Sequence, residues 1–283
     1  MNKIMTIPSS LDEIYETKNI VDGFIIGIKN YCVNVNYCID DLNILNDLCD
    51  KDIFIAINKN LDNKDLPKLR ELLLELNNYN IIGVIFYDIG LLNMYNNLDL
   101  SYDLVWGQEH LTTNYNTINF YSSYNVKYTY ISSDITLDEI KEIQNNTSNK
   151  LLVNCFGYLP MFVSKRHIVK NYLEYFNLND SSNINYMYKE GKTYPIIDND
   201  IATMCYSANI LNGIKEYINL DNCYVVLNSF NIDMQDFIDV INLFKNVNKE
   251  NVLEYKDIID KKFVNVDDGF LNTRTIYKVK NEK

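Results

Sequence analysis

The sequence predicts an α/β protein, a closed (β/α)8 barrel of the TIM type with an insertion after the seventh strand. Short apolar runs alternate with amphipathic stretches throughout the 283 residues, which is typical of strand–helix repeats. Eight runs are rich in Ile, Val, Phe and Tyr without strict polar alternation, as expected of parallel strands covered on both faces. Eight strands, most of them followed by a helix, favour a barrel over an open doubly wound sheet, which is the alternative.

The apolar runs define the expected strands in chain order. They are Lys3–Ile7, Gly23–Ile28, Asp52–Asn58, Ile82–Tyr87, Tyr102–Trp106, Lys127–Ile131, Leu151–Phe156 and Cys223–Asn228. Between them, Leu66–Leu76 repeats Leu at helical spacing, and Leu137–Ile143 follows Thr136 with Glu139 in capping-box position. Asp233–Phe244 carries another apolar stripe. No Gly-rich loop follows any strand, which argues against a dinucleotide or phosphate-loop site.

The rhythm of strands and helices breaks after the seventh strand. Residues 158–206 are predicted to insert a helix at Ser164–Phe176, a polar loop and a β-hairpin. The hairpin strands are Ile184–Lys189 and Tyr194–Ile197, with Ile201–Tyr206 as a continuation of the second. They flank turns at 189–192 and 198–200, and we interpret Asp198 and Asp200 as ordinary turn residues. Long insertions on a barrel usually serve as lids or binding walls.

We therefore assign residues 1–249 to the barrel with its insertion. Residues 250–283 form a C-terminal extension that we expect to pack on the barrel and to include an extended segment at Thr273–Val279. We find no internal repeat and no linker that would require two domains.

Composition limits the partners and the compartment. A formal net charge of −12 argues against indiscriminate binding to nucleic acid or to anionic membranes, because the long-range field is repulsive. RNA is therefore not favoured as a partner, although Lys165, Arg166, His167 and Lys170 form a local basic spot. The N-terminus has no apolar signal region, no apolar run is long enough to span a bilayer, and the six cysteines show no CxxC pair. We expect a cytoplasmic, soluble protein with reduced thiols and no membrane partner.

Rare residue types gather in two short segments. Both histidines, the single tryptophan and one of the three arginines lie within Val105–Asn114 and Phe156–His167. Both segments begin at the predicted end of a strand, and the C-terminal strand ends of such barrels carry the ligand-binding and catalytic groups. The sequence therefore places the functional site at this mouth of the barrel.

These two segments resemble peptidase family U32, and the resemblance covers nearly the whole chain. Trp106–Asn114 looks like the family's strand that ends in a small residue and Gln before an Asn opens the next helix. Phe156–Met161 followed by Ser164 and Arg166 looks like its Gly–Pro/Met–Ser–Arg signature. Tyr194–Asn209 resembles its downstream hairpin, and Gly269–Val279 its short-form ending. The resemblance implies a bacterial TIM-like barrel and, by the family's name, hydrolysis of peptide bonds. Other branches act as accessory or catalytic proteins in the hydroxylation of tRNA, rRNA or ubiquinone precursors.

Many relatives carry an iron–sulfur cluster on four cysteines, and this sequence departs from their pattern. His167 stands where a cysteine follows the Ser-x-Arg element, and no cysteine occurs between Leu178 and Tyr188. Cys32 alone is near the place of a further ligand, and a cluster needs four thiolates. We expect neither this cluster nor any other cofactor or metal. A different grouping of Cys32, Cys155 and Cys205 would have to form in space, whereas free cysteine is usually a small buried hydrophobe.

Candidate site residues follow from their places at strand ends. His110, Asp88 and Gln108 are the candidates for catalysis, with His110 or Asp88 as a base. Asn58, Lys59, Ser164, Arg166 and His167 are the candidates for substrate binding, with Arg166 clamping a carboxylate or phosphate. Glu109 faces away from its neighbours by strand alternation. Each also has a structural interpretation: Asp88 and His110 as helix caps, Glu109 in a surface ion pair, and Arg166 on a solvated helix face.

The sequence leaves three functions open. The family name makes hydrolysis of a peptide or of a small substrate the first, although Ser–His–Asp, Cys155–His and zinc arrangements find little support in the sequence. A factor that modifies RNA or a small molecule by hydroxylation is the second. A noncatalytic binding barrel is the third.

Overall fold

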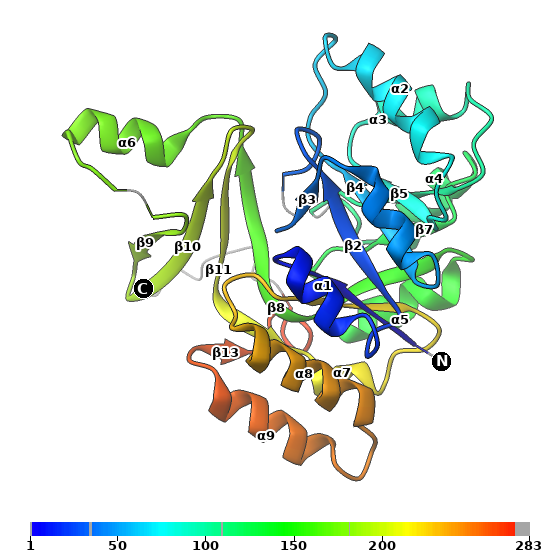
Figure 1. Cartoon of the computed structure of the whole chain (residues 1–283). Coiled ribbons are helices and arrows are strands. Elements are labelled where there is room, and N and C mark those ends of the chain that lie inside the picture. The colour runs from blue at the N-terminus through cyan, green and yellow to red at the C-terminus, as the bar shows by residue number, and fades with distance from the viewer. Residues whose placement is uncertain (1, 34–35, 109, 181, 275–283) are drawn as a thin grey trace, which may run out of the picture.

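A computed structural model describes residues 2–33, 36–108, 110–180 and 182–274. Within these residues eight parallel strands close into a barrel with helices outside it, which confirms the predicted fold (Figure 1). Closure comes from the last strand, which pairs in parallel with both the first and the seventh. In chain order the barrel strands are β1 (Lys3–Ile7), β2 (Gly23–Ile28), β4 (Asp52–Ile57), β5 (Gly83–Phe86), β6 (Asp103–Trp106), β7 (Tyr128–Tyr130), β8 (Lys150–Ser164) and β12 (Tyr224–Asn228).

Helices cover the outside of the barrel where the apolar stripes predict them. α2 spans Leu66–Leu76, as expected, and buries Leu69, Leu73 and Leu76 of its Leu stripe. Thr136 and Glu139 form the predicted capping box at the start of α5 (Leu137–Asn146). The remaining elements are α1 (Leu11–Thr17), β3 (Cys38–Ile39), the 3-10 helix η1 (Leu42–Leu48), α3 (Ile89–Tyr95), α4 (Tyr115–Ser122), α7 (Ile214–Tyr217) and α8 (Met234–Asn246).

Strand alternation divides the apolar side chains into two cores. One set fills the barrel interior, including Met5, Ile25, Phe54 and Val105. The other packs between the strands and the surrounding helices. Because the interior is filled by side chains, a ligand has to bind at an end of the barrel rather than inside it.

The insertion is an arm that begins as a continuation of the seventh strand. β8 runs through the barrel wall and on to Ser164, and Gly157 sits where it leaves the barrel with a positive φ of 107°. A Cβ at Gly157 would lie 2.2 Å from the carbonyl oxygen of Asn228, so only glycine fits there. The arm continues with α6 (Ile168–Phe176), β9 (Asn185–Lys189), β10 (Lys192–Asp198) and β11 (Thr203–Asn212).

The arm corrects two expectations about the insertion. Ser164 ends a strand and does not begin the helix, which starts four residues later, because Tyr158–Ser164 pairs with β11 instead of coiling. Ile201–Tyr206 does not continue the preceding strand; most of it belongs to β11, which pairs antiparallel with β10 across the turn at Asn199. The predicted hairpin of β9 and β10 is present, and the whole forms a four-stranded antiparallel sheet with β8.

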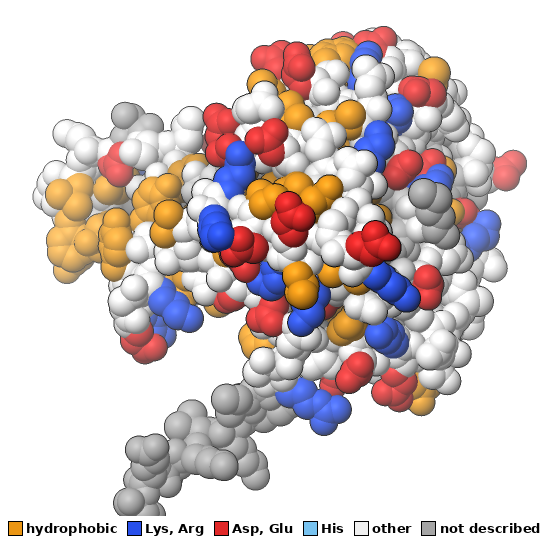
Figure 2. Space-filling view, turned by 90° about the horizontal axis from the view of Figure 1, so that it is seen from below, with side chains coloured by type: hydrophobic (Ala, Val, Ile, Leu, Met, Phe, Trp, Pro, Cys, Tyr) orange, Lys and Arg blue, Asp and Glu red, His pale blue; other side chains and the backbone are white. Residues whose placement is uncertain are grey.

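The arm projects from one side of the barrel, and hydrophobic side chains gather on its surface (Figures 1 and 2). Among its exposed large side chains are Tyr172, Tyr175 and Phe176 of α6 and Tyr188 of β9. On its other side, Tyr206 stacks on Phe230 at 3.9 Å between ring centroids and joins the arm to the barrel.

The C-terminal part lies against the base of the arm. α9 (Val252–Lys262) contacts α7 and β11, and β13 (Val266–Asp267) pairs in parallel with β11. Most of the extended segment expected at Thr273–Val279 lies outside the described residues. Every helix in the described part of the chain is too short or too polar to span a bilayer.

Candidate functional site

A pocket of 330 Å³ opens at the C-terminal mouth of the barrel. Its floor is apolar, and its walls carry tyrosine, asparagine, serine and histidine side chains. Asp134 is the only carboxylate among its described lining residues. The lining residues include Ile25, Ile85, Asn58, Tyr87, His110, Tyr130, Ser133, Asp134, Asn154, Leu159, Met161, Ser207, Asn228 and Phe270. A small ligand with uncharged polar edges fits this lining better than an anion does.

One wall is built from a line of hydrogen bonds between neighbouring strand ends. The Tyr130 hydroxyl donates to Oδ1 of Asn154 at 2.5 Å, and Nδ2 of Asn154 donates to Oγ of Ser133 at 2.8 Å. Asn154 stands in the middle of the apolar run of β8, where strand alternation turns it into the barrel. These bonds fix the direction of each donor and acceptor that a ligand would meet.

The opposite wall is held by the connection that follows β2. Oδ1 of the buried Asn58 accepts the Val33 amide at 2.9 Å. Nδ2 of Asn36 donates to Oδ1 of Asn228 at 2.8 Å, and Asn228 in turn donates to the carbonyl oxygen of Tyr158 at 3.2 Å. Asn58 therefore lies at the mouth, and its orientation depends on residues of this connection.

His110 borders the pocket and makes a contact with an aspartate. Its Nδ1 lies 3.2 Å from Oδ2 of Asp134, and both side chains are close to half exposed, at 48% and 45%. An aspartate on Nδ1 leaves Nε2 to act on a ligand. Gln108 lies beside it in the larger groove described below, and Glu109 is outside the described residues.

A groove of 630 Å³ runs from this pocket between the barrel and the arm. It shares Asn58, Tyr87, His110 and Met161 with the pocket, so the two spaces are continuous. Its walls also carry charged side chains: Lys59, Lys64, Lys165 and His167 with Asp62, Asp65 and Asp200.

Lys59 lines this groove in a fixed position. Its Nζ lies 3.1 Å from Oδ2 of Asp65 and 5.0 Å from the ring centroid of Tyr31. A hydrogen bond from the Asp62 amide and the charge of Lys59 hold the pKa of Asp65 below its usual value, so the Asp65 carboxyl is ionised at neutral pH. Lys165 joins the arm to the same loop through Asp62 at 3.1 Å.

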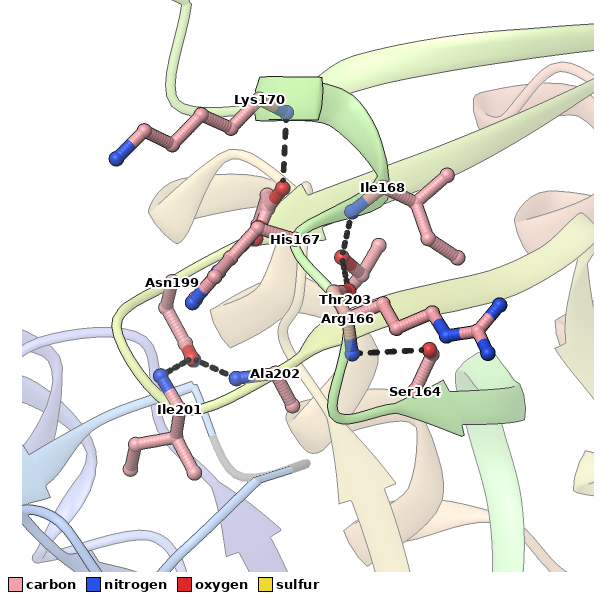
Figure 3. A network of polar contacts seen from close by, with 10 residues as sticks. Ser164, Arg166, His167, Ile168, Lys170, Asn199, Ile201, Ala202 and Thr203 are labelled. Carbon is pink, nitrogen blue, oxygen red and sulfur yellow. Dashed lines mark hydrogen bonds and ion pairs between the residues drawn. The ribbon is translucent and has the colours of Figure 1, made fainter. Parts of the chain in front are cut away.

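His167 also pairs with an aspartate, but inside the arm (Figure 3). Its Nδ1 lies 2.9 Å from Oδ1 of Asp198, whose side chain is only 9% exposed. Oδ2 of Asp198 accepts the amide of Lys170 at 3.0 Å in the first turn of α6. His167 is the residue at the N-cap and supplies no side-chain cap, so Asp198 takes over that role from β10.

Three predicted site residues lie outside both spaces. Asp88 caps α3, with Oδ1 accepting the Gly90 amide at 2.7 Å and Oδ2 the Leu61 amide at 3.2 Å. Oγ of Ser164 accepts the Arg166 amide at 3.1 Å. The Arg166 side chain is exposed and points away from His167 in Figure 3. The structure thus brings Asn58, Lys59, Gln108, His110 and His167 together and leaves Asp88, Ser164 and Arg166 apart.

Cysteine supplies no nucleophile at the mouth. Cys155 is fully buried in the outer core, and burial raises the pKa of its thiol well above the ordinary value. Cys32 and Cys205 lie elsewhere, in the barrel interior and in the arm. The described residues contain no group of three or more side chains suited to holding a metal, so they do not fit the four-cysteine cluster of some relatives.

The sequence did not point to Asp134, Asp198, Tyr130 or Asn154 as site residues. Asp198 was interpreted as an ordinary turn residue, although it holds both His167 and α6. One signal was available: Asn154 is a lone polar residue in an apolar strand, which often indicates an inward-facing contact.

The fold and the site together define an α/β barrel with a ligand pocket at the C-terminal mouth and an arm that forms one side of its entrance. The model of peptidase family U32 matches residues 28–254, and the chain belongs to this family. Its structure is similar to that of the U32 peptidase Mk0906, with a TM-score of 0.52 and 11% identity, over 82% of this chain and 95% of that chain. The chain is also 23% identical to tRNA hydroxylation protein P2 of Bacillus subtilis (strain 168), over 90% of this chain and 92% of that protein.

Proposed function

We propose that this protein serves in the hydroxylation of tRNA by binding one unstacked base of the RNA in the mouth pocket. The pocket at the barrel mouth, with its apolar floor and its asparagine amides, is the observation that carries the proposal. The likeness to tRNA hydroxylation protein P2 over most of both chains supports it. Proteins that act on a base within RNA or DNA have to take that base out of its stack and hold it in a fitted pocket.

The pocket has the size and the groups for this task. At 330 Å³ it is at the small end of ligand sites, which suits one nucleoside better than an extended peptide. Asn58, Asn154 and Asn228 present amides near its apolar floor, and amides can pair with the edge of a base. Tyr87 and Tyr130 supply aromatic rings on which a base can stack.

The adjoining groove suits the sugar–phosphate chain on either side of that base. Lys59, Lys64 and Lys165 line it, and lysine contacts to phosphate position RNA without reading its sequence. Such contacts are local, so they are compatible with a net charge of −12 that opposes binding elsewhere on the surface. The chain's own part in this proposal is to bind and orient the base.

Peptide hydrolysis is the second candidate, and the His110–Asp134 pair is the observation that favours it. A histidine oriented by aspartate can act as a general base toward water. Both carboxylate oxygens of Asp88, the other base expected from the sequence, accept backbone amides: one from Gly90 in α3 and one from Leu61. Without a positioned nucleophile in the described pocket, this reaction would depend on a water activated by His110.

The test is deletion of the gene followed by mass spectrometry of the nucleosides from purified tRNA. We expect a hydroxylated nucleoside to be lost and to return with the wild-type gene, but not with Asn154→Ala or His110→Ala. Asn119→Ala, which removes an exposed amide on α4 away from the mouth, is the matched control and should restore it. Unchanged nucleosides after deletion would refute the proposal. Release of peptides by purified wild type, abolished in His110→Ala, would favour hydrolysis instead.

A further inference from the structure

Two cysteines lie together in the barrel interior against Gly27 of β2, and neither of them lines the mouth pocket. Cys38, the first residue of β3, pairs through its Cα with Gly27 of β2. Its Sγ lies 2.5 Å from the position that a Cβ at Gly27 would take, and Sγ of Cys32 lies 2.9 Å from the same position. The missing side chain of Gly27 therefore makes the space in which the two sulfur atoms meet.

The two thiols differ in access and in acidity. Cys32 is buried, at 2% exposed, whereas Cys38 is partly exposed. A hydrogen bond from Cys32 lowers the pKa of Cys38, against the opposing effect of burial. A partly exposed thiol with a lowered pKa and a second thiol beside it is the arrangement of an attacking and a resolving cysteine.

We propose that Cys32 and Cys38 form a redox-active dithiol that a small-molecule disulfide converts to an intramolecular disulfide. The Cys38 thiolate attacks one sulfur of the oxidant, forms a mixed disulfide and releases one thiolate. Cys32 then loses its proton to solvent and attacks the Cys38 sulfur, which releases the second thiolate. The protein loses two electrons and two protons, and one disulfide becomes two thiols.

The pair is connected to the mouth pocket through described contacts. Cys32 is followed by Val33, whose amide holds Asn58, and Asn36, two residues before Cys38, holds Asn228. A disulfide between Cys32 and Cys38 would restrain the segment that carries Val33 and Asn36, and should therefore slow local opening at both contacts. The disulfide chemistry itself does not depend on the proposed function.

The experiment incubates the purified, reduced full-length protein with glutathione disulfide, followed by alkylation, intact mass measurement and peptide mapping. We expect wild type to lose two hydrogens and both alkylation sites at Cys32 and Cys38. Cys32→Ser should stop at the mixed disulfide on Cys38. Cys49→Ser, which removes an exposed cysteine elsewhere, should behave like wild type. Hydrogen exchange at the Val33 amide should slow at least threefold on oxidation and recover on reduction.

Other outcomes overturn the inference in distinct ways. If Cys32 and Cys38 both remain alkylatable, or if wild type stops at the mixed disulfide, the pair is not a redox-active dithiol. If the disulfide forms and Val33 exchange is unchanged, the connection to the pocket is refuted. Gly27→Ala is a second variant: its methyl group would displace both sulfurs and should slow disulfide formation at least tenfold, whereas an unchanged rate would contradict the geometry.

Discussion

The two histidines of this protein occur in similar local pairs that have different consequences. Each has an aspartate carboxylate near Nδ1, and each lines the groove between the barrel and the arm. At His110 the aspartate is 45% exposed and borders the pocket, whereas at His167 it is 9% exposed and also holds the start of α6. A His–Asp contact alone therefore does not identify a catalytic group; the burial and the other bonds of the aspartate decide its role.

The largest effect on stability is expected at the His167–Asp198 pair, whose aspartate side chain is only 9% exposed. Asp198→Ala removes the carboxylate that contacts the His167 ring and accepts the hydrogen bond of the Lys170 amide. We expect a loss of about 1 kcal/mol in the free energy of unfolding, as for the loss of a side chain that caps a helix. Urea unfolding measures it, with Asp200→Ala in the same turn as the exposed control. If the two variants were equally stable, Asp198 would not have the structural role that distinguishes its pair from the His110–Asp134 pair.

Substitution in the His110–Asp134 pair should change stability little and weaken ligand binding more. His110→Ala should change the free energy of unfolding by no more than about 0.5 kcal/mol, because the side chain is half exposed. Under the proposed function it should weaken binding of bulk tRNA about tenfold, a loss of about 1.4 kcal/mol. Fluorescence titration at fixed salt measures the affinity. If His110→Ala kept its full affinity for tRNA but lost stability, His110 would have a structural role and not the ligand-binding role that we assign to it.

The sequence predicts the strands and helices of the barrel well and the side-chain contacts of the site poorly, because the first depend on local patterns and the second on residues far apart in the chain. Apolar runs and caps are local signals, so β1, β2 and α2 match their expected ranges. A strand that continues beyond the barrel has no such signal, so the end of β8 was interpreted as the start of a helix. The aspartate partners lie 24 and 31 residues from their histidines, and only the folded chain brings them together.

The ion pair between the arm and the barrel should contribute less to stability than the His167–Asp198 pair does. Lys165 and Asp62 are 3.1 Å apart, and both side chains are 55% exposed. Solvent screens such a pair, so Lys165→Met should cost at most about 0.5 kcal/mol of stability. If Lys165 contacts phosphate, the variant should also lower the salt dependence of tRNA binding by about one unit of slope. An unchanged slope would show that Lys165 only joins the arm to the barrel.

The smallest effect is expected at Arg166, the residue that the sequence favoured as an anion clamp. Its guanidinium points away from His167, and its main-chain carbonyl, which accepts a hydrogen bond from Oγ1 of Thr203 at 2.7 Å, survives any substitution of the side chain. Arg166→Ala should therefore change stability by less than about 0.5 kcal/mol and should restore the hydroxylated nucleoside in the deletion strain. Arg166→Lys is the charge-matched control. If alanine fails where lysine succeeds, the positive charge beyond the groove matters, and the RNA contacts extend across the outer face of the arm next to His167.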